Sequence, residues 1–395
     1  MVEWARPLDA LIANDLDGAL EWYEKRRANI VNQPANLYNW ARLLCSLDRR
    51  AEAEPFFDRL ADVDDYAMFV AGQRLIGAIG GGLSPEQALN VTPLGAAERH
   101  RAAIAAALAE FDITRRPPPA RHIAISGIAF CGSTLMDLLL EGVPGVASIG
   151  ESVWLTLGWI DQKGVPFNYS EPRGRGVQGC NYCGGGCEVL TANFRTAMGL
   201  NPVDWYLRIA EQLGTAIIVS ADKNLPKTVL MEPRLRLTGL VVFKSPKQAW
   251  ASTYSKTSAG KTPEQTFQGM VNFLDVWKWA YGEMARTFKP VGGKVFLDFD
   301  RFTHAPEAMF RSMVRALDLE YDPAAFVKPE PGHSLGGNNA AIRRVRSAGH
   351  SVDVYPLGEP DIPAEHAEWI DSQADLTELH ALLEQLSEDD LARAA

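Results

Sequence analysis

The sequence predicts an α/β fold built on a parallel sheet, preceded by an all-α domain of helical repeats. Between residues 8 and 108, amphipathic helical runs alternate with short polar breaks, and strand-like alternation is nearly absent. Beyond residue 120, short apolar runs are separated by helical segments. These runs do not alternate, as expected for strands that are buried on both faces of a parallel sheet.

Composition limits the classes of partner. The chain has 395 residues, of which 47% are hydrophobic and 22% charged, as in ordinary globular proteins of more than one domain. With 39 basic and 49 acidic residues the net charge is −10, so no overall positive field attracts nucleic acid or an anionic membrane. A bound anion therefore needs a local site. No apolar run approaches the roughly 18 residues of a membrane span.

The N-terminus and the cysteines indicate a cellular compartment. The first residues lack the basic region and apolar stretch of a secretory signal. Five cysteines in a chain of this length do not form a disulfide scaffold. We therefore expect a cytoplasmic protein.

Residues 1–115 form the expected helical domain. Segments 36–44 and 47–57 indicate two antiparallel helices with small alanines where they cross, which resembles a tetratricopeptide unit. Segment 17–23 resembles the second helix of a preceding, degenerate unit. One and a half repeats fit equally a groove for a protein or peptide partner and a helical packing extension.

A proline run marks the expected domain boundary. Arg115-Arg116-Pro117-Pro118-Pro119 ends the helical pattern, because consecutive prolines lack N–H donors and fix φ. We place an α/β domain at 120–350 and an acidic helical tail at 351–395. Strands are expected at 122–126, 216–220, 240–243 and 294–299.

A glycine loop, residues 127–134, joins the first expected strand to a helix that begins near Leu135. Glycines let backbone N–H groups surround an anion, and the helix N-terminus adds partial positive charge. The frame is that of a nucleoside-triphosphate loop, except that Ser133 replaces the lysine. That absence counts against ATP or GTP hydrolysis and favours a less charged transferred group. A turn built for close packing is the alternative. The candidate anion contacts are Gly127, Cys131, Gly132, Ser133 and Thr134.

A second motif leaves a strand and enters a helix. Lys244 ends the strand, Pro246 follows, and Ser252 lies eight residues after the lysine. A cation at a strand end and a hydroxyl on the next helix can converge on one phosphate. Taken separately, either residue is typical of an ordinary surface position.

Together the loop and the second motif resemble the sulfotransferase family over roughly residues 121–345. The resemblance implies a P-loop-like sulfotransferase architecture, with 3′-phosphoadenosine 5′-phosphosulfate as the donor. The family has a basic residue where this chain has Phe130. It also has arginine at the position of Lys244, which keeps the charge and loses the bidentate fork.

The resemblance also implies catalytic residues. Glu151 follows Gly150 as in the family's Gly-Glu pair and would accept the proton of an acceptor hydroxyl. Lys223 would stabilise charge on the bridging oxygen and replace the cation missing at Phe130. The alternative is that Glu151 only orders the loop by holding Lys223. Asn338 resembles a later Gly-Asn segment that reaches the nucleotide.

A cysteine cluster lies in an insertion near residues 180–187. Cys180, Cys183 and Cys187 are turned by glycines as in a zinc knuckle, but a fourth ligand is not evident. A structural zinc, a disulfide with one free thiol, and buried thiols all fit.

The predicted function is transfer of a sulfonyl group to a hydroxyl acceptor, which is a peptide, a carbohydrate or a small metabolite. Two rivals stand beside it. One is a P-loop nucleotide kinase, and the other is a non-catalytic adaptor with a degenerate nucleotide site, which Phe130 favours.

Overall fold

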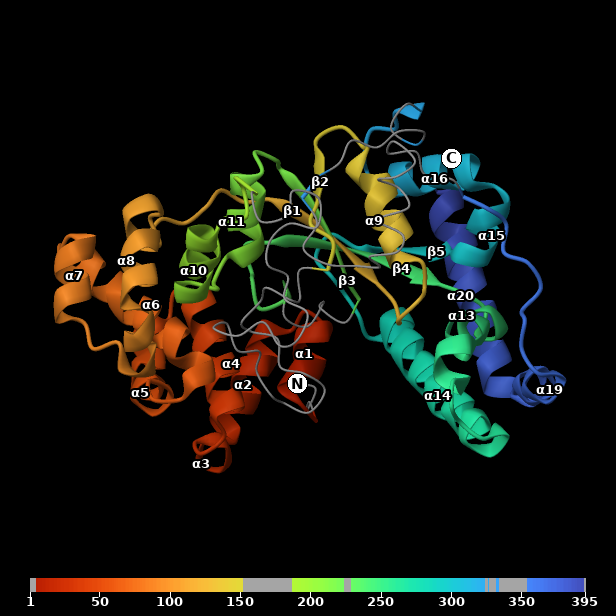
Figure 1. Cartoon of the computed structure of the whole chain (residues 1–395), viewed down its shortest axis with the longest axis horizontal. Coiled ribbons are helices and arrows are strands. Elements are labelled where there is room, and N and C mark those ends of the chain that lie inside the picture. The colour runs from red at the N-terminus through yellow and green to blue at the C-terminus, as the bar shows by residue number, and fades with distance from the viewer. Residues whose placement is uncertain are drawn as a thin grey trace.

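A computed structural model describes residues 5–151, 187–223, 229–323, 326, 332–333 and 354–393. Every described element before residue 121 is helical, and these helices gather on one side of the molecule (Figure 1). They are α1 Pro7–Ile12, α2 Leu16–Lys25, α3 Arg27–Ile30, α4 Pro34–Ser46, α5 Arg50–Leu60, α6 Asp64–Gly80, α7 Pro85–Val91, η1 Gly95–His100 and α8 Arg101–Glu110.

The rest of the chain is built on one parallel sheet, so the α/β prediction is confirmed. Its described strands are β1 Arg121–Ser126, β2 Val146–Ser148, β3 Ile217–Lys223, β4 Arg236–Phe243 and β5 Lys294–Asp298. The strand order is β2-β3-β1-β4-β5, and every neighbouring pair is parallel. Strand β2 was not predicted, because three residues are too short a run to show a strand pattern.

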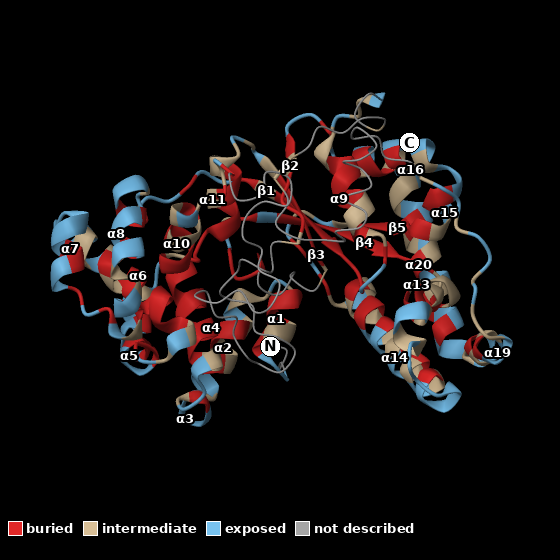
Figure 2. Ribbon diagram, viewed as in Figure 1, coloured by how far each residue is buried: buried red, intermediate tan, exposed pale blue. Residues whose placement is uncertain are grey.

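Helices cover both faces of the sheet. On one face lie α9 Ser133–Glu141, α15 Phe299–His304 and α16 Pro306–Ala316, and on the other lie α13 Pro246–Ser258, α14 Pro263–Arg286, α19 Ala364–Ser372 and α20 Ala374–Ala392. Leu240 and Val242 of β4 join the first core, whereas Val241 and Phe243 join the second. Burial on both faces explains the continuous apolar runs, and Figure 2 shows the strands buried between the helices.

The N-terminal helices also pack on the sheet. Their large core side chains, such as Trp40 and Phe57, belong to one hydrophobic core with Ala124 of β1 and Ile218 of β3. Two further helices, α10 Ala192–Leu200 and α11 Trp205–Gln212, lie between them and the sheet (Figure 1). The α4 and α5 helices pack on each other where paired helices were expected. The boundary at 115–120 stays a prediction.

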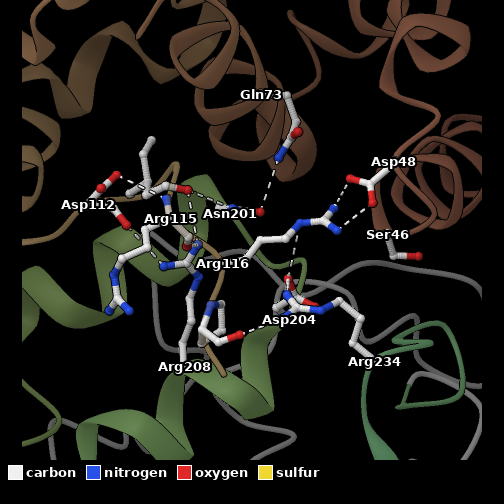
Figure 3. A network of polar contacts seen from close by, with 12 residues as sticks. Ser46, Asp48, Gln73, Asp112, Arg115, Arg116, Asn201, Asp204, Arg208 and Arg234 are labelled. Atoms are coloured by element: carbon white, nitrogen blue, oxygen red, sulfur yellow. Dashed lines mark hydrogen bonds and ion pairs between the residues drawn. The ribbon is translucent and has the colours of Figure 1, made fainter. Parts of the chain in front are cut away.

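Polar contacts also join the N-terminal helices to the segments that flank the sheet (Figure 3). Arg116 forms an ion pair with Asp48 of the helical half, and its Nε lies 4.0 Å from the Asp204 carboxylate. Arg234 Nη1 lies 3.0 Å from the same carboxylate. Arg116, which immediately precedes the proline run, therefore contacts both the N-terminal helices and the residue that precedes α11.

A buried ion pair makes the deepest of these links. Arg42 Nη2 of α4 lies 3.0 Å from Glu232 Oε1, in the connection between β3 and β4. The two side chains are 1% and 0% exposed. Burial raises the pKa of Glu232, while the Arg42 charge opposes that rise. Water therefore has little access to either side chain, so it could not replace a lost partner.

The acidic tail packs against β5, the edge strand. Asp390 Oδ2 accepts a hydrogen bond from Phe296 N at 3.0 Å, and Ser387 Oγ accepts one from Asp298 N at 3.2 Å. Side chains of α20 thus pair the edge strand's N–H groups, which protects the edge from other strands. Within the described ranges, no helix is long and apolar enough to cross a lipid bilayer.

Candidate functional site

The candidate residues gather at the carboxyl edge of the sheet. The glycine loop follows β1, Glu151 follows β2, Lys223 ends β3 and Lys244 follows β4. Because all strands are parallel, these ends meet at one edge. The α9 helix after β1 and the α13 helix after β4 lie on opposite faces. Where two neighbouring strands are followed by helices on opposite faces of the sheet, a crevice lies between the strand ends. Open α/β sheets bind their ligands in this crevice.

Two glycines give the loop its close fit. Gly132 has φ 104° and immediately precedes α9, and a Cβ there would lie 2.2 Å from the Phe299 ring. At Gly127 a Cβ would lie 2.7 Å from Val242 O. Only glycine fits at position 132, because its φ is left-handed and a Cβ there would also clash with the Phe299 ring. The backbone therefore passes closer to its neighbours than a side chain would permit.

The loop side chains lie close to two lysines. Cys131 and Ser133 are buried, and Thr134 is half-buried. Burial raises the pKa of the Cys131 thiol, and the nearby Lys223 and Lys244 ammonium groups oppose that rise. Both positive charges therefore act on the loop.

Lys244 and Ser252, the two residues predicted to converge on a phosphate, contact each other as their spacing predicts. Lys244 Nζ donates to Ser252 Oγ at 2.9 Å, and Lys244 is 7% exposed. Burial lowers the pKa of Lys244. Asp300 Oδ2 accepts a hydrogen bond from Ser245 N at 2.9 Å, which fixes the turn between the lysine and the helix.

Glu151 and Lys223 form an ion pair at the end of β3, with side chains 15% and 22% exposed. The Gly150 carbonyl accepts a hydrogen bond from Ala221 N at 2.8 Å, which ties the end of β2 to β3. This contact suits a base held beside a charge-stabilising lysine. It equally suits a carboxylate that only orders the loop.

A buried polar group behind Glu151 was missed from the sequence. Ser148 Oγ donates to Asp137 Oδ1 at 2.5 Å and accepts a hydrogen bond from Gly150 N at 3.3 Å. Burial raises the pKa of Asp137 to about 7, the Ser148 hydrogen bond opposes the rise, and the charges of Asp222 and Glu151 add to it. A single acid within the apolar run Leu135 to Leu140 was the available signal.

Asp137 makes stability depend on pH. Its ordinary pKa is 3.8 and its folded value about 7, so between these values the folded state holds a proton that the unfolded state loses. Its contribution is complete below pH 3.8 and is lost as pH rises towards 7. Since one pKa unit is worth about 1.4 kcal/mol, Asp137→Asn is expected to remove about 2 to 3 kcal/mol of the decline in unfolding free energy between pH 5 and 8.

Urea denaturation at both pH values measures this difference. The exposed Asp361 offers the matched control. The free energy of unfolding of Asp361→Asn should decline with pH as that of the wild type does. An equal decline in Asp137→Asn and wild type would contradict the assignment.

The cysteine and asparagine predictions lie mostly outside the described residues, which include neither Cys180, Cys183 nor Asn338. Cys187 is a buried free thiol whose Sγ lies 3.3 Å from His333 Nδ1. Among the described ranges, no cluster of three or more histidine, cysteine or acidic side chains can hold a metal. The structural zinc therefore gains no support here and stays a prediction.

The fold and the site define a glycine-loop α/β protein whose polar residues meet at the carboxyl edge of a parallel sheet. The chain matches no protein-family profile and no curated protein. Among solved structures it is similar to the sulfotransferase domain from the Synechococcus PCC 7002 olefin synthase, with 14% identity and a TM-score of 0.42 over 69% of this chain and 97% of that one.

A second solved structure is the sulfotransferase domain from the curacin biosynthetic pathway, with 14% identity and a TM-score of 0.41. It covers 68% of this chain and 99% of that chain. At these scores the similarity does not identify the chemistry of this protein. The comparisons do not confirm the tetratricopeptide interpretation.

Proposed function

We propose that this protein transfers a sulfonyl group from 3′-phosphoadenosine 5′-phosphosulfate to a hydroxyl acceptor. The observation that carries the proposal is the convergence of the Lys244–Ser252 pair with the glycine loop at one edge of the sheet. A donor with a phosphate at each end of its ribose needs two anion sites. The pair supplies one and the loop supplies the other.

The residues present fit such a donor. Lys244 and Ser252 would hold the 3′-phosphate, and the loop N–H groups with Ser133 and Thr134 would hold the 5′ end. Gly132, at a φ of 104° and close against the Phe299 ring, lets the loop turn directly into the N-terminus of α9. Ser133 stands in place of the triphosphate-binding lysine, which disfavours a kinase.

In the proposed reaction the acceptor hydroxyl attacks sulfur. A new bond forms between the acceptor oxygen and sulfur, while the bond between sulfur and the bridging phosphate oxygen breaks. Glu151 accepts the hydroxyl proton, and Lys223 stabilises the charge left on the bridging oxygen. The products are a sulfate ester and adenosine 3′,5′-bisphosphate. A peptide, a carbohydrate and a small metabolite are the acceptor classes open to this site.

Adenosine 3′,5′-bisphosphate is expected to raise the midpoint of thermal unfolding by several degrees. A ligand at 100 times its Kd stabilises a folded protein by about 2.7 kcal/mol. The measurement is a thermal-shift titration with the bisphosphate and, separately, with ATP and magnesium. Stabilisation by ATP alone would support a kinase, and stabilisation by neither would support an adaptor.

Two lysine variants locate the bound nucleotide. Lys244→Met should abolish the shift, because it removes the cation at the 3′-phosphate. Lys247→Met is the matched control three residues later, where the lysine pairs with Asp371 at the surface. A full shift in Lys244→Met would contradict the proposed 3′-phosphate site.

A further inference from the structure

The glycine loop has no cation of its own, but a lysine from another element lies on it. Phe130 occupies the loop position where a basic residue was expected, and its side chain is 38% exposed at a φ of 66°. Lys256 Nζ, from the last turn of α13, lies 4.1 Å from the centroid of the Phe130 ring. An ammonium group over an aromatic face is held by the ring's electrostatic field. The ring therefore places a positive charge beside the loop.

The other two lysines beside the loop already contact polar side chains. Lys223 forms its ion pair with Glu151. Lys244 is buried, bonds Ser252 and lies 5.0 Å from the Phe299 ring centroid. Lys256 is exposed, and no acidic side chain of the described ranges forms an ion pair with it. Of these three lysines it is the only exposed one.

The α13 helix connects Lys256 to the phosphate pair. Ser252 and Lys256 are four residues apart, so they lie on one face of the helix, separated by about 6 Å along its axis. Ser252 contacts Lys244 and Lys256 contacts Phe130. One face of α13 thus runs from the candidate 3′-phosphate site to the glycine loop.

We propose that Lys256, positioned by the Phe130 ring, is the cation that binds the 5′-phosphate end of the nucleotide. This inference rests on the proposed function and extends it by one binding residue and one positioning residue. Lys256 replaces the loop's missing basic residue, and Lys223 stays free to act with Glu151. Phe130 then marks a relocated cation in a working site and not a degenerate one.

Lys256→Met is expected to weaken adenosine 3′,5′-bisphosphate about 10-fold or more, since a charged hydrogen bond is worth about 1.5 to 3 kcal/mol. Binding of adenosine 3′-monophosphate, which lacks the 5′ group, should be unchanged. Isothermal titration calorimetry with both nucleotides measures this selectivity. Lys244→Met should weaken the binding of both nucleotides. Lys261→Met, at an exposed lysine, should weaken the binding of neither.

A rescue variant separates a lost cation from a disturbed fold. Phe130→Lys combined with Lys256→Met should recover bisphosphate binding, because it returns a cation to the loop. Equal bisphosphate affinity in wild type and Lys256→Met would overturn this inference alone. If the wild type binds no bisphosphate, the proposed function fails and this inference fails with it.

Discussion

Glu151→Gln is expected to lower turnover by roughly 10²- to 10⁴-fold, the usual contribution of a general base. Glutamine has nearly the shape of glutamate but cannot accept the proton of the acceptor hydroxyl. Binding of adenosine 3′,5′-bisphosphate should be unchanged, since Glu151 follows β2 and the proposed nucleotide contacts follow β1 and β4. The measurement is bisphosphate release from the phosphosulfate donor, with cell extract as the source of acceptor, beside calorimetric binding.

Lys223→Met distinguishes a base from a loop-ordering carboxylate. If Glu151 only holds Lys223, the double variant Glu151→Gln/Lys223→Met loses no more turnover than Lys223→Met alone. If Glu151 is the base, the double variant loses much more turnover than Lys223→Met alone. Unchanged turnover in Glu151→Gln would show that the base lies elsewhere. Mass spectrometry of the same extract, searching for an added sulfonate, identifies the acceptor.

Arg42→Met is expected to lower the free energy of unfolding by about 3 to 5 kcal/mol, the usual cost of breaking a buried ion pair. It leaves Glu232, which is 0% exposed, without its cation. Burial raises the pKa of that carboxyl, and the loss of Arg42 removes the charge that opposed the rise. The loss should therefore be larger at pH 8 than at pH 5, where a proton can neutralise Glu232. Urea denaturation at the two values measures it.

Two controls test the physical cause. Arg42→Met/Glu232→Met removes both charges and should be more stable than the single variant, because no unpaired charge stays buried. Arg49→Met breaks the exposed pair with Glu52 and should cost far less than Arg42→Met, because water replaces the lost partner. A single variant at Arg42 as stable as wild type would show that the pair contributes little.

The strands and the glycine loop were predictable because their signals are local. An apolar run buried on both faces of a sheet is recorded in consecutive residues, as in Leu240 to Phe243. The Lys244–Ser252 contact was predictable for a similar reason. The lysine ends a strand and the serine lies on the next helix, so their separation follows from one strand–turn–helix unit.

Contacts between distant segments could not be predicted in this way. Arg42 and Glu232 are 190 residues apart, and Phe130 meets Lys256 only because α13 returns to the loop from β4. Asp137 was overlooked because its partner Ser148 belongs to β2, a three-residue strand that the sequence pattern does not show. The sequence by itself determined the fold class, the loop and the spacing of Lys244 and Ser252, since each depends on neighbouring residues. Only the tertiary structure decided which charges meet, because strand order and helix packing bring distant segments together.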